Sequence, residues 1–333
     1  MSRYHELKMT FEEKRYFKIV CGAGNEDAEE VRKLSLVYTL AGALGIDVSA
    51  NVDVVKGAVG GVGKAFDLAP VLGKTLKTRP YINVSIGMRG DPHIRKAIID
   101  SSICISCGKC RPVCLQKAID EQFRVIEKRC IGCGECSVVC PVKAVSFFDK
   151  RKELENILPQ CLKNGAETFE LHAIIPDDES VMKDWQLMSA ILKGNYISVC
   201  LDRLQLSDEH ILRRLFEVQK IVGDRFIVQA DGVPMSGGSD SFNTTLQAVA
   251  ICDMVRKNKV QAMLLASGGT NSKTGELLKL CGVDVNGVSI GTFARKIVSK
   301  QIDDPRFDSD RTILKDAVDI AERLVKGNLE QIK

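Results

Sequence analysis

The chain has 333 residues, of which 45% are apolar and 27% charged, and its formal net charge is +4. This composition is typical of a folded globular protein and excludes a disordered or fibrous chain. The charge is too small to favour nucleic acid as a partner. The longest uncharged apolar run, residues 34–46, is too short to span a bilayer, and the N-terminal residues lack the apolar core of a signal peptide. We therefore expect a cytoplasmic protein with no membrane span.

The unusual feature of the composition is its 13 cysteines. Without a secretory signal, metal binding explains them better than a disulfide framework. Eight of them form two runs with one spacing, C-x2-C-x2-C-x3-C. The first run is Cys104, Cys107, Cys110 and Cys114, and the second is Cys130, Cys133, Cys136 and Cys140, followed by Pro141.

This spacing is typical of bacterial ferredoxins that hold two [4Fe–4S] clusters, in which the fourth cysteine of each run binds the other cluster. It predicts one cluster on Cys104, Cys107, Cys110 and Cys140, and another on Cys130, Cys133, Cys136 and Cys114. A pair of four-cysteine zinc sites is the alternative. Zinc sites usually separate two cysteine pairs by a longer gap, so the spacing favours iron and sulfur. Gly108, Gly132 and Gly134 permit the tight loops that such clusters need.

The remaining chain alternates between short strand-like runs and amphipathic helical stretches. The runs begin at Phe17, Ile46, Tyr81, Thr168, Tyr196, Phe226, Gln261 and Asn286. Helical stretches such as 29–43, 208–222, 244–257 and 272–280 lie between them. Eight strand–helix units predict an α/β fold, specifically a (β/α)8 TIM-like barrel.

One interval between strands is too long for a simple barrel. The third and fourth strands start 87 residues apart, whereas the other starts are about 25 to 36 residues apart. The excess of roughly fifty residues is the length of a two-cluster ferredoxin. We therefore predict three segments: residues 1–98 form the first part of the barrel, 99–150 the ferredoxin insertion, and 151–333 the second part. The insertion would lie over the mouth of the barrel, where active sites occur.

Polar residues alternate with apolar ones along several of these strands. Because successive side chains of a strand face opposite ways, the polar set should face the barrel interior. A purely structural barrel fills its interior with Val, Ile and Leu, so a polar interior suggests a ligand or a reaction. The alternative is a polar network that is satisfied without any ligand. The candidates are Lys18, Asp47, Asn83, Glu170, His172, Gln229 and Asp231.

The last two strands end in glycine-containing loops, where many barrels bind phosphate through backbone N–H groups. The predicted phosphate site comprises Gly268, Gly269, Thr270, Gly291 and Thr292, although two ordinary turns would give the same pattern. The loop 231–238, which includes Gly232, is a candidate third wall or lid. We interpret the glycine-rich segment 57–63 as a flexible connection. Cys161, Cys200, Cys252 and Cys281 are predicted to be buried as small apolar residues.

Several segments together resemble a known family. They are residues 17–23, 46–50, 91–97, 231–237, 268–271 and 287–297. In this combination the chain resembles the LdpA (light-dependent period) iron–sulfur proteins over nearly its whole length. The resemblance implies two [4Fe–4S] clusters and a role in redox signalling, which in cyanobacteria conveys the redox state of the cell to the circadian clock.

The leading hypothesis is an iron–sulfur redox protein that passes electrons through its clusters to flavin mononucleotide or another phosphorylated ligand in the barrel mouth. Glu170 or His172 would donate a proton, with Lys18 and Asp47 beside the reacting group. The polar residues Asn83, Gln229, Asp231 and Gly232 would contact the ligand. The alternative is a redox sensor or electron carrier without turnover, which signals cluster state to a protein partner. A ligand-binding module that tunes cluster potential is a third possibility.

Overall fold

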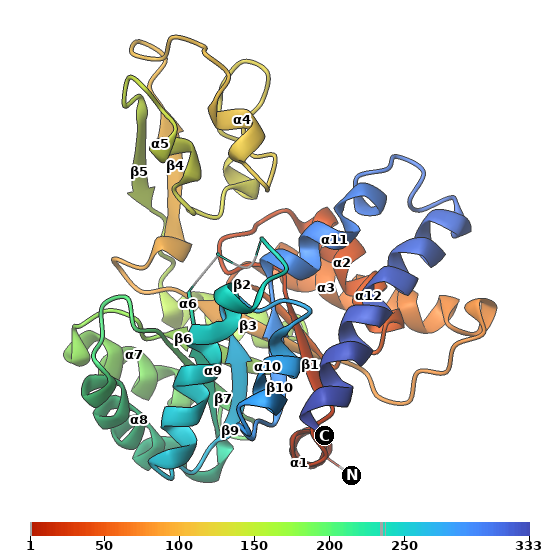
Figure 1. The fold of residues 1–333 in the computed structure, drawn as a ribbon, viewed down its shortest axis with the longest axis vertical. Coiled ribbons are helices and arrows are strands. Elements are labelled where there is room, and N and C mark those ends of the chain that lie inside the picture. Colours follow the sequence, from red (N-terminus) through yellow and green to blue (C-terminus); the bar gives the residue numbers. More distant parts are fainter. Residues whose placement is uncertain (1, 234–235, 237) are drawn as a thin grey trace.

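The computed structural model describes residues 2–233, 236 and 238–333. Within them, eight parallel strands close into a barrel in the order β1-β10-β9-β8-β7-β6-β3-β2 (Figure 1). They are β1 (Tyr16–Val20), β2 (Gly45–Ser49), β3 (Tyr81–Ile86), β6 (Thr168–His172), β7 (Ile197–Leu201), β8 (Phe226–Asp231), β9 (Met263–Ser267) and β10 (Gly287–Ile290). The predicted (β/α)8 barrel is confirmed, and every predicted strand begins within two residues of the observed start.

Helices on the outside follow the strands. They are α2 (Ala28–Leu40), α3 (Val52–Leu68), α6 (Leu154–Lys163), α7 (Asp178–Ile191), α8 (Asp208–Val222), α9 (Phe242–Lys257), α10 (Thr274–Leu280), α11 (Thr292–Ile302) and α12 (Arg311–Ile332). Short 3-10 helices span Pro70–Leu72, Pro92–Ile94, Glu127–Arg129 and Gly223–Arg225. Side chains cap several helices where the chain leaves a strand, as Asp27 does for α2 and Ser207 for α8. The last helix, α12, packs on α2, α10 and α11.

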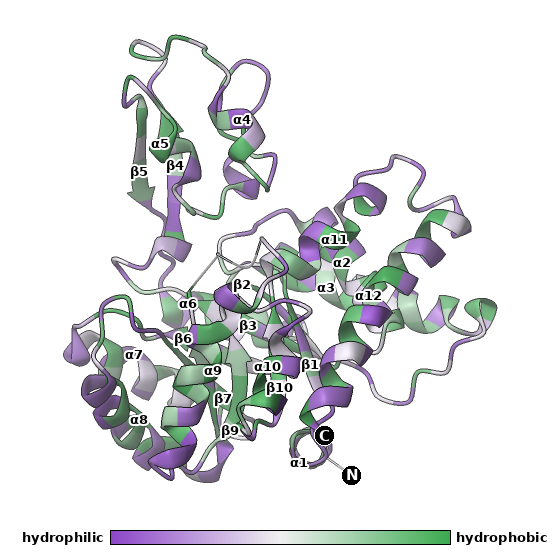
Figure 2. Cartoon of the chain, in the orientation of Figure 1, coloured by the Kyte–Doolittle hydropathy of each residue, from purple (hydrophilic) through white to green (hydrophobic). Residues whose placement is uncertain are grey.

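The strand pattern explains where the core lies. Ile46 and Val48 of β2 belong to the apolar core between sheet and helices, whereas Asp47 points into the barrel and bonds to β3. Figure 2 shows the result: the strands are largely hydrophobic, and the outer helices α7 and α8 carry hydrophilic residues. None of the described helices combines the length and hydrophobicity needed to cross a lipid bilayer.

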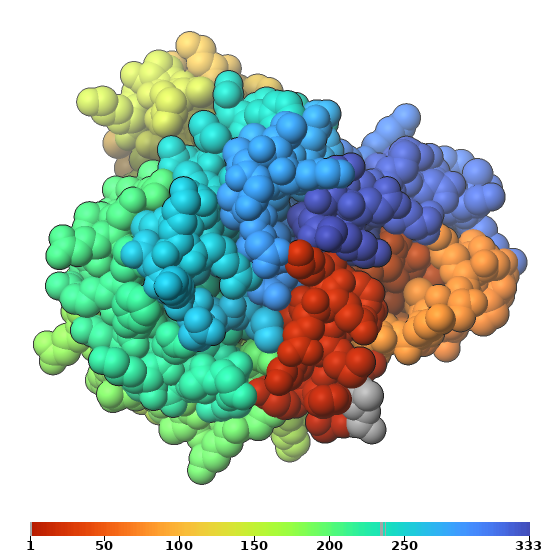
Figure 3. Space-filling model, turned by 60° about the horizontal axis from the view of Figure 1, so that its bottom comes forward, coloured from red at the N-terminus to blue at the C-terminus, as the bar shows by residue number. Residues whose placement is uncertain are grey.

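The two ends of the barrel differ in polarity. At the end where the strands begin, Leu7 and Phe11 of α1 (Arg3–Glu12) pack against Tyr16, Tyr81 and Tyr196. In Figure 3 this N-terminal segment, in red, lies on the surface against barrel segments that are coloured green and blue. This apolar cluster covers that end, and the polar cavity of the barrel lies at the carboxyl ends of the strands.

The glycine-rich segment 57–63 is not a flexible connection, so that interpretation is wrong. It lies inside α3, which packs closely on α2. A side chain on Gly57 would begin 2.5 Å from the Ala28 carbonyl oxygen, and one on Gly61 would begin 2.2 Å from that of Arg32. Gly57 and Gly61 therefore allow α2 and α3 to approach closely, and they do not form a flexible loop.

The predicted insertion follows β3. Its two strands, β4 (Arg95–Ile99) and β5 (Val145–Asp149), pair antiparallel, and between them lie α4 (Cys110–Val113) and α5 (Glu135–Val138). All eight clustered cysteines lie between these strands. In Figure 1 the insertion projects beyond the carboxyl ends of the barrel strands, on the side opposite α1.

Candidate functional site

The insertion contains two cavities that are each lined by four cysteines. One is lined by Cys104, Cys107, Cys110 and Cys140, and the other by Cys114, Cys130, Cys133 and Cys136. We call them the distal and the proximal cysteine cavity. The structure thus brings the cysteines together in the crossed groups that the spacing predicts, with one cysteine of each group supplied by the other run.

The backbone around both cavities suits iron–sulfur clusters. Backbone N–H groups donate to cysteine sulfurs from Ala97 to Cys130 at 3.3 Å and from Ala144 to Cys140 at 3.2 Å. Such bonds favour the thiolate form that binds iron. Burial and the neighbouring thiols raise the pKa of Cys136 to about 11, so thiolate formation at neutral pH requires a bound metal. The donors and their surroundings therefore fit a [4Fe–4S] cluster in each cavity.

A third cavity opens at the mouth of the barrel. Predicted site residues that line it are Asp47, Glu170, His172, Asp231, Gly268, Gly269, Thr270, Gly291 and Thr292. Lys18, Asn83 and Gln229 do not line it but hydrogen-bond to Glu170, which does. Gly232 does not line it either, and its N–H donates to the Ser267 carbonyl at 3.0 Å. Of the predicted loop 231–238, Pro234, Met235 and Gly237 lie outside the described residues.

Glu170 is the centre of the polar network. Its Oε2 accepts hydrogen bonds from Lys18 Nζ at 2.5 Å and from Gln229, and its Oε1 lies 3.3 Å from His172 Nε2. Burial would raise the pKa of Glu170, but the charges of Lys18 and His172 outweigh it and hold the pKa at about 2. Glu170 is therefore ionised at neutral pH even though it is buried.

Asp47 lies beside this centre on β2. Its Oδ1 accepts from Asn83 at 2.5 Å and from Ser85 at 2.7 Å, and lies 4.0 Å from Lys18 Nζ. Burial raises the pKa of Asp47 despite the nearby lysine. Burial would lower the pKa of Lys18, but Asp47 and Glu170 together raise it, so the ammonium remains charged.

A carboxylate that sequence reasoning did not single out organises the rim. Asp91 accepts from His93 Nδ1 at 2.7 Å and pairs with His172 Nδ1 at 3.1 Å. Burial alone would lower the pKa of His172. The negative charges of Asp91 and Glu170, which also hydrogen-bond to the ring, outweigh burial and raise the pKa well above its ordinary value. Asp91, His93 and His172 also place possible ligand atoms within 4.8 Å of one another, as a metal site would. Carboxylate–imidazole pairing already accounts for that spacing.

Two further acids have buried oxygens without partners among the described residues. Cys200 Sγ donates to Asp231 Oδ2 at 3.2 Å, but Asp231 Oδ1 and Asp202 Oδ2 have no partner there. Burial raises the pKa of Asp231, and raises that of Asp202 to about 6. Cys200 thus belongs to the polar network rather than to the apolar core, and Cys281, also predicted to be buried, is exposed. Its place at the end of α10, a short surface helix, explains the error.

The predicted phosphate loops meet at the same cavity. Gly268 and Gly269 both have positive φ, +62° and +70°, which favours glycine. A side chain on Gly268 would begin 1.3 Å from Asp231 Oδ1, and one on Gly269 would begin 2.1 Å from the Thr244 carbonyl. Gly291 is the N-cap of α11, and in the described residues no side chain caps this helix. Backbone N–H groups of its first turn therefore have no intrahelical partner, and Gly291 and Thr292 at this turn line the cavity.

One residue of the insertion lies at both the mouth cavity and a cysteine cavity. Ile131, between Cys130 and Gly132, lines both the mouth cavity and the proximal cysteine cavity. The contact is tight, because a side chain on Gly24 would begin 3.1 Å from Ile131 Cα. The proximal cavity therefore lies against the barrel mouth, and the distal one lies farther out.

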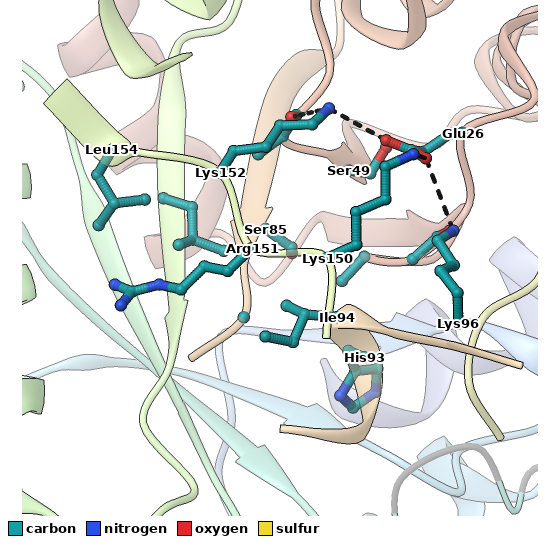
Figure 4. Close-up of a pocket in the computed structure, with 15 residues that line it drawn as sticks. Glu26, Ser49, Ser85, His93, Ile94, Lys96, Lys150, Arg151, Lys152 and Leu154 are labelled. Carbon is teal, nitrogen blue, oxygen red and sulfur yellow. Dashed lines mark hydrogen bonds and ion pairs between the residues drawn. The ribbon is translucent and has the colours of Figure 1, made fainter. Parts of the chain in front are cut away.

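A fourth cavity, shown in Figure 4, lies where the insertion meets the barrel, and its charges hold the two together. Glu26 accepts hydrogen bonds from Lys150 at 2.7 Å and from Lys152 at 3.0 Å. Burial would raise the pKa of Glu26, but these lysines outweigh burial and lower the pKa to about 2. Lys96 donates to the carbonyls of Gly24 at 2.6 Å and Cys130 at 2.7 Å. Since these groups satisfy one another, the cavity is a docking joint rather than a ligand site.

Comparison with known proteins adds two family matches. The light dependent period A C-terminal domain matches residues 161–327, and a 4Fe-4S binding domain matches residues 123–146. The protein light dependent period A of Synechococcus elongatus is 29% identical in an alignment 320 residues long, gaps included, and the alignment covers 84% of this chain and 80% of that protein. The 4Fe-4S match includes the second cysteine run, so the chain is an iron–sulfur protein.

Solved structures with a similar chain path have low sequence identity. The YdjI aldolase of Escherichia coli K12 is 9% identical with a TM-score of 0.46, covering 99% of this chain and 94% of that one. The tryptophan synthase alpha subunit of Legionella pneumophila is 11% identical with a TM-score of 0.44, covering 98% of each chain. The fold assignment here depends on the observed strand pairing and not on these likenesses.

Proposed function

The chain belongs to the light dependent period A (LdpA) family, and we propose that it is a cytoplasmic redox protein that delivers electrons to a flavin or another phosphorylated ligand in the barrel mouth. Cys104, Cys107, Cys110 and Cys140 would hold one [4Fe–4S] cluster, and Cys114, Cys130, Cys133 and Cys136 another. When bound, such clusters supply single electrons. None of the 13 cysteines forms a disulfide in the structure, which suits a reducing compartment.

The observation that carries the proposal is the shared wall at Ile131. Because Ile131 lines both cavities, the proximal cysteines and the mouth ligand would be neighbours. Glu26 and Lys96 hold the insertion in this position by bonds that cross the joint. An insertion that was merely tethered to the barrel would need neither the close packing nor the buried lysine.

The mouth also offers a proton donor. His172 lines the cavity and pairs with Asp91 and Glu170, which raise its pKa, so the imidazole carries a proton at neutral pH. Glu170, with a pKa of about 2, carries none. Of the two candidates from the sequence, His172 therefore suits proton donation, while Glu170, Asp47 and Lys18 orient and balance it.

A sensor or carrier without turnover is the second candidate, and the distal cavity favours it. Cys107 is exposed there, and Ile105 beside it is 61% exposed, which gives a protein partner direct access. The barrel network could then be structural, because its central charges pair with each other. Either function needs an electron donor or acceptor protein at this surface.

The test is to purify the protein without oxygen, denature it and identify any released organic molecule by absorbance and mass spectrometry. We expect a flavin or another phosphorylated compound, near one per chain. Gly269 is a poor site for a blocking variant, because any side chain there meets the Thr244 backbone. At Gly291 a side chain would begin 3.3 Å from Val20 Cβ, so Gly291→Val should fill the mouth with a small local shift.

Gly291→Val should lose the organic molecule and keep its iron. Gly60→Val is the matched control, because a side chain on Gly60 of α3 meets nothing within 4 Å. It should keep both. A wild-type protein that releases iron and sulfide but no organic molecule, and whose cluster state alone decides whether a partner protein binds, would support the sensor instead.

A further inference from the structure

Arg295, at the end of the first turn of α11, is a buried cation that forms no ion pair among the described residues. The residue is only 7% exposed. Glu30, which lines another cavity together with Arg295, and the Cys133 thiol act on its charge from beyond ion-pair distance. Arg295 Nη1 donates to Gln116 Oε1 of the insertion at 2.7 Å. Its Nε is buried and has no partner among the described residues. Burial of this kind is costly unless a negative charge completes the site.

Arg214 shows how the same fold treats a buried arginine that is structural. Its Nε donates to Asp178 at 2.8 Å, its Nη1 donates to the Ile175 carbonyl at 2.8 Å, and its Nη2 also pairs with Asp178. Every nitrogen of Arg214 thus has a partner within the barrel. Arg295 differs because, in the described part of the chain, its hydrogen-bond partner is a neutral amide oxygen from the insertion.

The surroundings of Arg295 are suited to an anion. It lines the mouth cavity together with Gly291 and Thr292, at the uncapped start of α11. Ser289 Oγ, on the same wall, is buried without a partner in the described part of the chain. Gly22, whose φ of +109° favours glycine, lies beside the guanidinium, because a side chain there would begin 3.5 Å from Arg295 Nη1. A guanidinium, a hydroxyl and a helix N-terminus therefore face one space.

We propose that Arg295 is the specificity-determining residue of an anion subsite in the mouth, and that the subsite takes the terminal phosphate of a phosphate monoester. Three kinds of donor suit the three free oxygens of such a group. Beside Gly268 in the same cavity, Asp231 Oδ1 has no donor among the described residues, so the rest of the ligand should carry a hydroxyl or N–H group. The inference rests on the proposed function in one respect: both concern the same cavity.

The test measures binding of inorganic phosphate and of glycerol 3-phosphate to the oxidised holoprotein by calorimetry, in chloride buffer. Arg295→Gln should weaken both about ten- to a hundred-fold, because a charge-assisted hydrogen bond is lost. Arg295→Lys should recover part of the affinity, since it keeps the charge but not the planar fork. Lys300→Gln is the control: it removes one exposed charge from the same helix and should change affinity less than two-fold. Glycerol 3-phosphate should bind the wild type more tightly than phosphate does.

Thermal unfolding separates a binding role from a structural one. Without phosphate, Arg295→Gln should melt no lower than the wild type, because an unpaired buried charge is removed. Added phosphate should raise the melting temperature of the wild type and of Lys300→Gln, but not that of Arg295→Gln. Equal phosphate affinity in the wild type and Arg295→Gln, or no binding to either, would overturn the inference. No electron donor is present, so this result is independent of whether the clusters reduce a ligand.

Discussion

The cysteine cavities of the insertion and the polar cavity of the barrel mouth are held together by different interactions. The described residues of the insertion form one small buried apolar cluster, which consists of Ala97, Ala118, Ile119, Cys130 and Cys136. Two of its five members, Cys130 and Cys136, are cysteines of the proximal cavity. The barrel instead has a continuous apolar core between strands and helices. Its mouth contains buried charges that pair with each other, such as Lys18 with Glu170 and His172 with Asp91.

The difference predicts how each region fails. A module with such a small apolar core depends on its metal for stability. The barrel has ample core, but its mouth depends on charge balance, because a buried charge that loses its partner is costly. Loss of a cysteine should therefore remove a cluster and loosen the insertion, and loss of a carboxylate should lower the stability of the whole barrel.

The largest effect is expected from cysteine variants that test the crossed cluster groups. Cys133→Ser should lose about half of the iron. Adding Cys114→Ser should cost little further iron, because both cysteines line the proximal cavity. Adding Cys104→Ser instead should remove nearly all of it, because Cys104 lines the distal cavity. Iron and sulfide are measured chemically on anaerobically purified protein.

Cys252→Ser is the control for these variants, since Cys252 is buried in α9, away from the insertion. It should retain all the iron. If the Cys114→Ser and Cys133→Ser pair lost nearly all the iron while the Cys104→Ser and Cys133→Ser pair kept half, the crossed grouping would be wrong. In every cluster-deficient variant the barrel should still unfold cooperatively, while residues 95–149 become sensitive to protease.

A smaller but still severe effect is expected from Glu170→Gln. The change leaves Lys18 and His172 buried with less negative charge, which costs roughly 3 to 5 kcal/mol of unfolding free energy. Lys18→Met combined with Glu170→Gln should be less destabilised than Glu170→Gln alone, because the double variant removes both charges of the pair. Denaturant unfolding measures both. A double variant that is less stable than either single variant would show that the pair is not the main contribution of Glu170.

The sequence predicts most of the architecture because its signals are local. Alternation of period two places each strand, and the cysteine spacing places each cysteine in its group. The excess length between Tyr81 and Thr168 locates the insertion. The segment 57–63 was misjudged because glycine is read as a loop signal, whereas here it lets α2 and α3 approach closely.

The site residues that the sequence missed are those whose partners lie far away in the chain. Asp91 acquires its role from His172, 81 positions later, and Arg295 from Gln116, 179 positions earlier. Glu26 meets Lys150 only because the insertion folds back on the barrel. Asp91 had one usable signal, its place in the loop after the third strand. Arg295 had none beyond following a glycine loop, since its importance lies in the absence of a counterion among the described residues.

The smallest expected effect concerns Asp202, which follows β7 and whose pKa burial raises to about 6 from an ordinary 3.8. Because the folded protein holds this proton more tightly than the unfolded chain, ionisation of Asp202 costs stability as the pH rises from about 3.8 through 6. The cost is fully present at pH 7 and absent near pH 3.5.

Asp202→Asn keeps an oxygen for the Leu204 N–H, which lies 2.8 Å from Asp202 Oδ1, and removes the charge. It should therefore be more stable than the wild type at pH 7, by roughly 2 to 3 kcal/mol, and equally stable at pH 3.5. Asp67→Asn, an exposed change of the same charge, should show no such difference between the two pH values. A variant less stable than the wild type at pH 7 would mean that a bound cation or donor stabilises the Asp202 carboxylate, and the barrel mouth would then depend on an occupant as the insertion depends on its metal.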